Sequence, residues 1–182
     1  MGRLAPIVAV TSTMLSLAAD SGPVRSVPEL DLSRYAGKWY EIARYPNRFQ
    51  KQCAGEVTAE YVLQPDGRII VINQCRKGDG SVDRAEGVAR KASPSGPDSQ
   101  LKVRFAPAFL SFIPAVWGDY WVVGLASDYS YAVVGDPSRN YLWILSRTPS
   151  LGADAYQQAV GAAVASGFDA SRLVRTPAIP DQ

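Results

Sequence analysis

The sequence contains no histidine, and this absence excludes several kinds of functional site. Histidine triads, histidine general bases, imidazole zinc sites and histidine-ligated haem all require that side chain. Only two cysteines occur among 182 residues, so a cysteine-rich metal cluster is excluded as well. Nineteen basic and seventeen acidic residues give a formal net charge of +2, which is too balanced for a protein that binds nucleic-acid phosphates. Carboxylate chemistry or ligand binding remains, and no metal or cofactor is predicted.

The composition, with 47% hydrophobic and 20% charged residues, is that of one soluble globular domain. At the N-terminus, Arg3 precedes an apolar stretch that ends in small residues, which is typical of a secretory signal peptide. A disordered start is the alternative, and the stretch is too short and interrupted for a transmembrane helix. We predict a signal peptide over 1–18, a linker over 19–30, one domain over 31–177 and a tail over 178–182. The expected location is extracytoplasmic, either periplasmic or associated with the outer membrane, and no cysteine near the cleavage site offers a lipid anchor.

Short strand-like runs, separated by turn signals, fill the middle of the chain. Pro65-Asp66-Gly67 is a tight hairpin signal, and Gly78-Asp79-Gly80 marks another turn. The eight predicted strands cover residues 38–45, 56–63, 68–76, 82–91, 100–105, 119–125, 131–135 and 141–147. Such a meander favours an all-β, eight-stranded antiparallel up-and-down barrel over a β-sandwich, which needs long crossing connections. Apolar residues at helical spacing over Asp154–Gly167 predict one C-terminal α-helix on the barrel wall.

Three short motifs fall where this topology brings them to one end of the barrel. Gly37-Lys38-Trp39-Tyr40 opens the first strand, Ser127-Asp128-Tyr129 forms the turn before the seventh, and Arg147 ends the eighth. Together these motifs resemble the three signature regions of the lipocalin family. The runs Trp39–Pro46 and Tyr141–Pro149 resemble its apolipoprotein D-like and bacterial outer-membrane branch. The resemblance covers about residues 30–177 and implies a barrel that binds a small hydrophobic molecule.

The same topology assigns structural roles to the motif residues and to the cysteines. We predict that the guanidinium of Arg147 stacks on Trp39 as a cation–π pair that closes one end, and a plain core role for Trp39 is compatible with this. Gly37, Asp128 and Tyr129 complete the signature at that end. Cys53 and Cys75 fall at the opposite end, where an exported protein is expected to form a disulfide and a cytosolic one to keep two buried thiols.

Alternation along the strands predicts which side chains line the barrel interior. If Arg147 points into the barrel, every second residue before it on the same strand also points inward, which places Trp143 and Tyr141 inside. The alternative for Trp143 is a position beneath the C-terminal helix. Parity on the other strands, aided by the resemblance on the third, gives the remaining predicted ligand-binding residues, which are Asn73, Val71, Phe105, Val103, Ala59, Tyr61 and Tyr120. This aromatic and aliphatic lining suits an elongated apolar molecule. Glu41 shares the parity of Trp39, and we expect it to reach solvent or to pair with an arginine.

The connection Ala106–Val116 is unusually apolar for a surface loop. Its large apolar residues, Phe109, Leu110, Phe112 and Ile113, predict either a lid or membrane-touching lip, or a loop folded down as extra core. Taken together, the sequence predicts a non-catalytic carrier or scavenger of a fatty acid or lysophospholipid. Two alternatives stay open. One is a lipocalin-fold enzyme acting on a lipid, with Glu41 or an unpaired cysteine as the reactive group. The other is an envelope interaction protein with a filled barrel.

Overall fold

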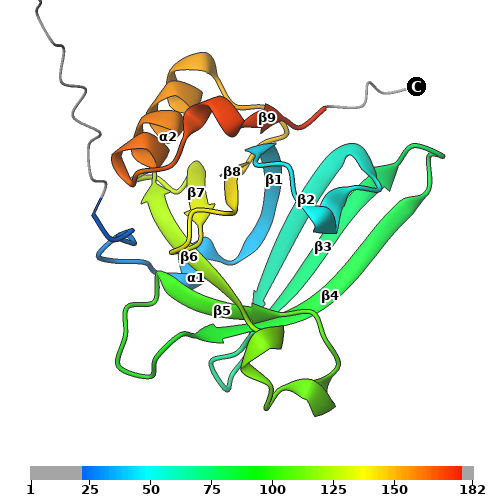
Figure 1. Ribbon diagram of the computed structural model, residues 1–182, viewed down its shortest axis with the longest axis vertical. Coiled ribbons are helices and arrows are strands. Elements are labelled where there is room, and N and C mark those ends of the chain that lie inside the picture. The colour runs from blue at the N-terminus through cyan, green and yellow to red at the C-terminus, as the bar shows by residue number, and fades with distance from the viewer. Residues whose placement is uncertain (1–21, 178–182) are drawn as a thin grey trace, which may run out of the picture.

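A computed structural model describes residues 22–177, which form an antiparallel β-barrel with a helix on its outside (Figure 1). The predicted signal peptide over 1–18 and the tail over 178–182 lie outside the described residues. The barrel strands are β1 (Gly37–Arg44), β2 (Cys53–Leu63), β3 (Ile69–Lys77), β4 (Val82–Lys91), β5 (Gln100–Arg104), β6 (Gly118–Leu125), β7 (Tyr131–Gly135) and β8 (Leu142–Ser146). The other elements are helices α1 (Leu32–Tyr35) and α2 (Ala153–Ala165), strand β9 (Val174–Arg175) and the 3₁₀ turns η1 (Arg48–Gln50), η2 (Ala108–Leu110), η3 (Pro114–Val116) and η4 (Ala170–Arg172).

The order of the strands closes the sheet. Each strand from β1 to β8 pairs antiparallel with the next, and β1 pairs with both β2 and β8. The predicted eight-stranded barrel is therefore confirmed, and the β-sandwich alternative is wrong. The β1–β2 pairing extends from Gly37↔Tyr61 to Tyr40↔Thr58, and β9 then pairs with the end of β1.

The turns between the strands are formed by the residue types that such turns require. In the β2–β3 hairpin the backbone N–H of Gln64 donates to the carbonyl of Arg68 over 2.8 Å. Gly67 in this turn has φ +79°, a conformation that glycine adopts without a steric penalty. The hairpin fixes the register of β2 against β3, and so it fixes which of their side chains face inward.

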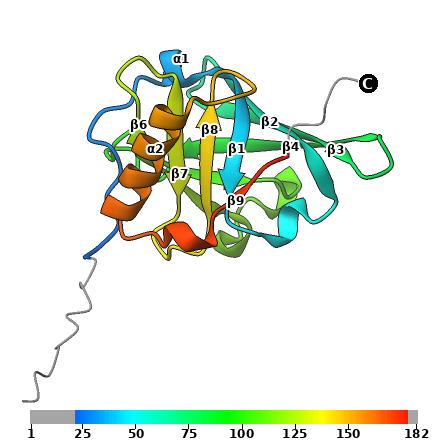
Figure 2. The ribbon, with the colours of Figure 1, turned by 90° about the horizontal axis from the view of Figure 1, so that it is seen from above.

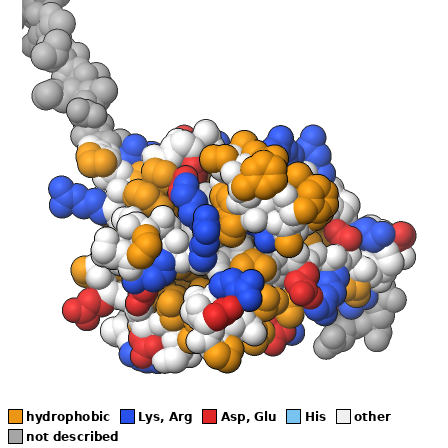
Figure 3. Space-filling view, turned by 90° about the horizontal axis from the view of Figure 1, so that it is seen from below, with side chains coloured by type: hydrophobic (Ala, Val, Ile, Leu, Met, Phe, Trp, Pro, Cys, Tyr) orange, Lys and Arg blue, Asp and Glu red, His pale blue; other side chains and the backbone are white. Residues whose placement is uncertain are grey.

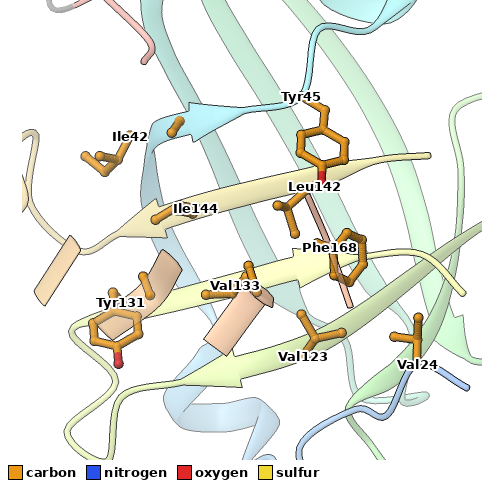
Figure 4. Close-up of a cluster of buried hydrophobic side chains, with 12 residues drawn as sticks. Val24, Ile42, Tyr45, Val123, Tyr131, Val133, Leu142, Ile144 and Phe168 are labelled. Atoms are coloured by element: carbon orange, nitrogen blue, oxygen red, sulfur yellow. The ribbon is translucent and has the colours of Figure 1, made fainter. Parts of the chain in front are cut away.

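Two clusters of buried side chains lie on opposite sides of the barrel wall. On β7, Ala132 and Val134 belong to the inner cluster, whereas Val133 belongs to the outer one. The outer cluster fills the space beneath α2 and is completed by Phe168 (Figure 4). Because a Cβ at Gly124 would lie 2.8 Å from the Cβ of Ala162, only glycine lets α2 approach this closely.

Helix α1 was not expected from the sequence, because its four residues are too few to show a period. Asp31 caps it by accepting hydrogen bonds from the backbone N–H groups of Ser33 and Arg34. Figure 2 shows α1 at one end of the barrel and α2 along its wall. The described part of the expected linker also lies against the barrel, since Val27 N–H donates to the carbonyl of Val122 over 2.8 Å.

Several predicted boundaries differ from the structure by a few residues. The predicted helix Asp154–Gly167 extends over Ala153–Ala165, and β2 begins at Cys53 instead of Glu56. Five residues predicted to be in strands each lie one position outside the observed strand, and they are Tyr45, Arg68, Phe105, Tyr141 and Arg147. Within the described residues, no helix is both long enough and apolar enough to cross a lipid bilayer.

Candidate ligand-binding site

One end of the barrel is closed by a stacked tryptophan and arginine. The guanidinium carbon of Arg147 lies 3.8 Å from the centroid of the Trp39 ring, so the predicted cation–π pair is present. The guanidinium also donates hydrogen bonds to the backbone carbonyls of Ala36, Lys38 and Arg34. Trp39 is fully buried. Burial lowers the pKa of Arg147.

The other signature residues shape the same end without entering the stack. Asp128 accepts a hydrogen bond from the backbone N–H of Ser130, and its hydrogen bonds with Ser130 hold the pKa of this carboxyl below its ordinary value. The Tyr129 ring packs against the guanidinium of Arg34 at 3.9 Å. Gly37 has φ +91°, and a Cβ there would lie 3.5 Å from the Arg147 guanidinium. Asp128 therefore stabilises its own turn, and its hydrogen bond is with Ser130 and not with the Trp39–Arg147 pair.

Most of the predicted lining residues face the barrel interior. Tyr61 and Val71 are buried in the inner cluster, and the predicted residues packed against it are Ala59, Val103, Tyr120 and Trp143. Asn73 lies opposite Ala59 in the β2–β3 register and is partly buried. Ala59 pairs with Trp39 on β1 and with Asn73 on β3, and it is partly buried. Six of the nine predicted ligand-binding residues therefore belong to the inner cluster or pack against it.

Trp143 faces the interior of the barrel. Its neighbours Leu142 and Ile144 belong to the outer cluster beneath α2, so the alternative position of Trp143 under that helix is wrong. The Trp143 and Tyr141 rings are stacked, with centroids 5.9 Å apart and planes at 8°. Tyr141 also contacts the ring of Phe49, with centroids 5.6 Å apart. The β1–β2 loop therefore lies against the aromatic pair at the open end of the barrel.

Phe105 lies just beyond β5 and is 43% exposed. Its ring occupies the space in front of Gly87 on β4, where an added Cβ would lie 2.7 Å from the ring. The absence of a side chain at Gly87 thus gives Phe105 its place beside the interior. The sequence predicted the inward direction of Phe105, and the structure shows that much of its ring stays in contact with solvent.

Glu41 is buried and fully engaged. The Arg44 Nη1 atom lies 3.1 Å from its carboxylate, and Gln50 and Thr176 donate further hydrogen bonds to it. The expected pairing with an arginine is therefore confirmed. Gln50 also accepts a hydrogen bond from Trp143 Nε1 over 3.1 Å, so it links the carboxylate to the interior. Sequence reasoning missed Gln50 and Thr176, because they come from a loop and from the C-terminal segment.

Three tyrosines meet inside the barrel. The Tyr120 hydroxyl lies 2.7 Å from the hydroxyl of Tyr35 and 2.7 Å from that of Tyr61. Burial raises the pKa of Tyr61 to about 12 and raises the pKa values of Tyr35 and Tyr120 as well. Tyr35 was missed from the sequence because it belongs to α1, and only the Asp31 cap could have indicated that helix.

Cys53 on β2 and Cys75 on β3 form a disulfide, with Cα atoms 5.6 Å apart. The predicted bond is confirmed. Both cysteines of the chain are used in it, so an unpaired cysteine as the reactive group of an enzyme is wrong.

A groove of about 860 Å³ lies on the outside of the barrel, where β1 and β2 separate. Outward-facing residues dominate its lining, and three inward-facing residues, Glu41, Val57 and Cys75, also contribute to it. Its lining contains none of the predicted ligand-binding residues.

The apolar β5–β6 loop projects into solvent. Phe109 is 74% exposed and Phe112 is 78% exposed, so these two rings are not the extra core that was one of the two expectations. Figure 3 shows hydrophobic side chains gathered over this loop. The base of the loop is fixed by Trp117, whose ring lies 4.2 Å from the Arg90 guanidinium.

Comparison with known proteins connects this arrangement to one family. The model of the lipocalin-like domain matches residues 30–178. Temperature-induced lipocalin-1 of Arabidopsis thaliana is 47% identical over 152 residues, which are 83% of this chain and 81% of the relative. The outer membrane lipoprotein Blc of Escherichia coli K12 is 36% identical over 178 residues, covering 94% of this chain and 96% of the relative. The structure of insecticyanin from Manduca sexta is similar with a TM-score of 0.62 and 21% identity, covering 86% of this chain and 85% of that protein.

Proposed function

Because this chain belongs to the lipocalin family, we propose that it carries a small hydrophobic ligand inside its barrel without changing that ligand chemically. Members of the family generally bind or transport small hydrophobic molecules. The main support is the barrel interior, where apolar and aromatic side chains such as Ala59, Val103 and Trp143 remain accessible to solvent. The Trp39–Arg147 stack closes one end of the barrel, so we expect the ligand to enter at the opposite end.

The ligand class that we propose is a fatty acid or a lysophospholipid. An acyl chain can lie along the aliphatic and aromatic lining, since burial of apolar surface drives its binding. The charged headgroup stays near the open end, because a buried and unpaired charge is costly. Trp143 and Tyr141 contribute flat apolar surface close to that entrance.

We propose an extracytoplasmic location, periplasmic or at the outer membrane. The Cys53–Cys75 disulfide favours an oxidising compartment. The signal-like N-terminal stretch and the similarity to an outer membrane lipoprotein favour it too. The exposed rings of Phe109 and Phe112 form a lip that suits contact with a lipid surface, from which such a carrier takes its ligand.

The proposed function is tested by binding at Trp143. Native mass spectrometry of the purified protein should show a co-purified lipid that is returned unchanged. Titration with a fatty acid should change the indole fluorescence, and Trp143→Phe should remove most of that change and weaken binding modestly. Trp143→Arg should block uptake, because it places an unpaired charge among apolar side chains.

The control is Trp117→Phe, since Trp117 packs outside the barrel against Arg90. This variant should keep the fluorescence response to the fatty acid. If Trp143→Phe keeps the response as well, and a folded Trp143→Arg variant binds with unchanged affinity, the ligand does not occupy the barrel interior and the proposal is wrong.

A further inference from the structure

Three hydrogen-bonded tyrosines, Tyr35, Tyr120 and Tyr61, form a group that we call the phenol chain. Their hydroxyl groups carry one proton more than the hydrogen bonds between them use. The chain contains two hydroxyl–hydroxyl contacts, each of 2.7 Å. Each contact uses one proton, whereas three phenols carry three. In every orientation of the chain, one O–H group therefore finds no acceptor among the described residues.

This extra donor lies inside the barrel. Tyr35 is 2% exposed and Tyr61 is 5% exposed, and both belong to the inner cluster that also contains Trp39. Tyr120 packs against that cluster and remains partly accessible to solvent. In the ligand-free barrel, water can accept the third proton. A ligand that fills the interior displaces this water, so the O–H group then needs an acceptor on the ligand itself.

The charges around the phenol chain determine which acceptor fits. Arg147 lies near the phenol chain, and its positive charge acts on Tyr35. Its guanidinium already donates to three backbone carbonyls at the closed end. Glu41 is engaged by Arg44, Gln50 and Thr176. A carboxylate beside the phenols would thus be buried without a free cation, at a large cost in desolvation.

We infer that the phenol chain binds an uncharged oxygen acceptor, such as the carbonyl of a ketone or an ester, at the buried end of an elongated apolar ligand. This inference rests on the proposed carrier function and narrows it. The inference predicts that ligands of equal hydrophobicity bind with different affinities, depending on which chemical group lies at the end that enters the barrel first. An acyl chain that enters with its methyl end leaves the third proton without an acceptor, and it therefore binds less tightly than a matched chain ending in a carbonyl.

The test compares 2-undecanone with undecane in displacing a fluorescent apolar probe. The quantity of interest is the ratio of the two affinities, because changes in pocket size affect both ligands alike. Replacing all three phenols with phenylalanine (Tyr35→Phe, Tyr61→Phe, Tyr120→Phe) removes every donor. The ratio should then fall about fivefold, which corresponds to the typical net strength of one hydrogen bond. Tyr120→Phe alone leaves two hydroxyls without partners, so the preference for the ketone should persist or increase.

The matched control is Tyr45→Phe. The Tyr45 hydroxyl donates to the carbonyl of Asp169 over 2.8 Å, and its ring lies in the outer cluster, so the ratio should not change. A second readout needs no variant: the carbonyl stretch of the ketone bound to the wild-type protein should lie at lower frequency than in an alkane solvent.

If the carbonyl stretch matches that in the alkane solvent, or if the ratio is unchanged in the triple variant, the inference is overturned. If the protein still binds undecane in that case, the proposed carrier function remains supported although the inference fails. If the folded wild-type protein binds neither compound, both the inference and the proposed function fail.

Discussion

The Trp39–Arg147 stack predicts that Trp39→Ala destabilises the fold more than any other change at the closed end. The indole is fully buried, donates from Nε1 to the carbonyl of Tyr35 over 2.8 Å, and packs on the Tyr35 ring with centroids 5.0 Å apart. Replacing a buried tryptophan with alanine typically costs about 3–5 kcal/mol. Because the cavity would lie between the barrel floor and α1, which is a single turn, we expect a value in the upper half of this range.

Arg147→Ala should cost less. Loss of the cation–π contact accounts for about 0.5–2 kcal/mol. The three carbonyl groups that accept hydrogen bonds from Arg147 lie near solvent, and water can replace the guanidinium there. We therefore expect a total loss of about 2–3 kcal/mol. Arg147→Lys should recover only part of it, since one ammonium group cannot reproduce a planar guanidinium that reaches several acceptors at once.

Urea denaturation followed by far-ultraviolet circular dichroism measures both losses without relying on the tryptophan signal. Arg48→Ala is the matched control, because Arg48 lies over Phe49 in an exposed cation–π contact of 5.0 Å. Its loss should stay below about 0.5 kcal/mol. A larger loss for Arg147→Ala than for Trp39→Ala would refute the assignment of this stack as a closure built around a buried indole.

Two further predictions concern the disulfide and the buried phenols. Replacing Cys53 and Cys75 together with serine should cost about 3 kcal/mol in urea denaturation, because the bond spans a sequence separation of 22 residues. A loss below about 1 kcal/mol in a folded variant would show that the bond contributes little constraint. Burial raises the pKa of Tyr61 from 10.0 to about 12, so its contribution to stability is complete below pH 10 and is lost as the pH rises toward 12. Tyr61→Phe should therefore lose less stability than the wild type between about pH 9 and about pH 11.5, and equal losses in the two proteins would contradict this linkage.

The barrel and most of its inward-facing residues follow from the sequence because strand geometry has a period of two. Once Arg147 is placed at the closed end, parity alone sends Trp143 inward and Leu142 and Ile144 toward α2. The disulfide follows from the same reasoning, because Cys53 and Cys75 lie near the ends of strands that meet at one rim. Turn residues such as Gly67 supply the boundaries that make the parity count possible.

The contacts that sequence reasoning missed come from segments too short or too irregular to show a period. Gln50 lies in a three-residue 3₁₀ turn, and Thr176 follows a two-residue strand. Both reach Glu41 because β1 and β2 separate beyond Tyr40 and the C-terminal segment takes the free edge of β1. Local propensity does not encode such long-range pairings, which depend on where the closed barrel leaves a gap.

The phenol chain shows how a long-range contact changes the expected chemistry of the interior. Taken separately, Tyr61 and Tyr120 are aromatic positions in an apolar lining, and Tyr35 precedes the first strand. The closed barrel brings the hydroxyl groups of Tyr35 and Tyr61 each to 2.7 Å from the hydroxyl of Tyr120. The sequence predicts an aromatic and aliphatic pocket with few polar groups. Protons can be counted against acceptors only when these distances are known, and the count then shows a hydrogen-bond donor at the closed end of the barrel. Selectivity inside this barrel should therefore depend on where a ligand carries its oxygen as well as on its length.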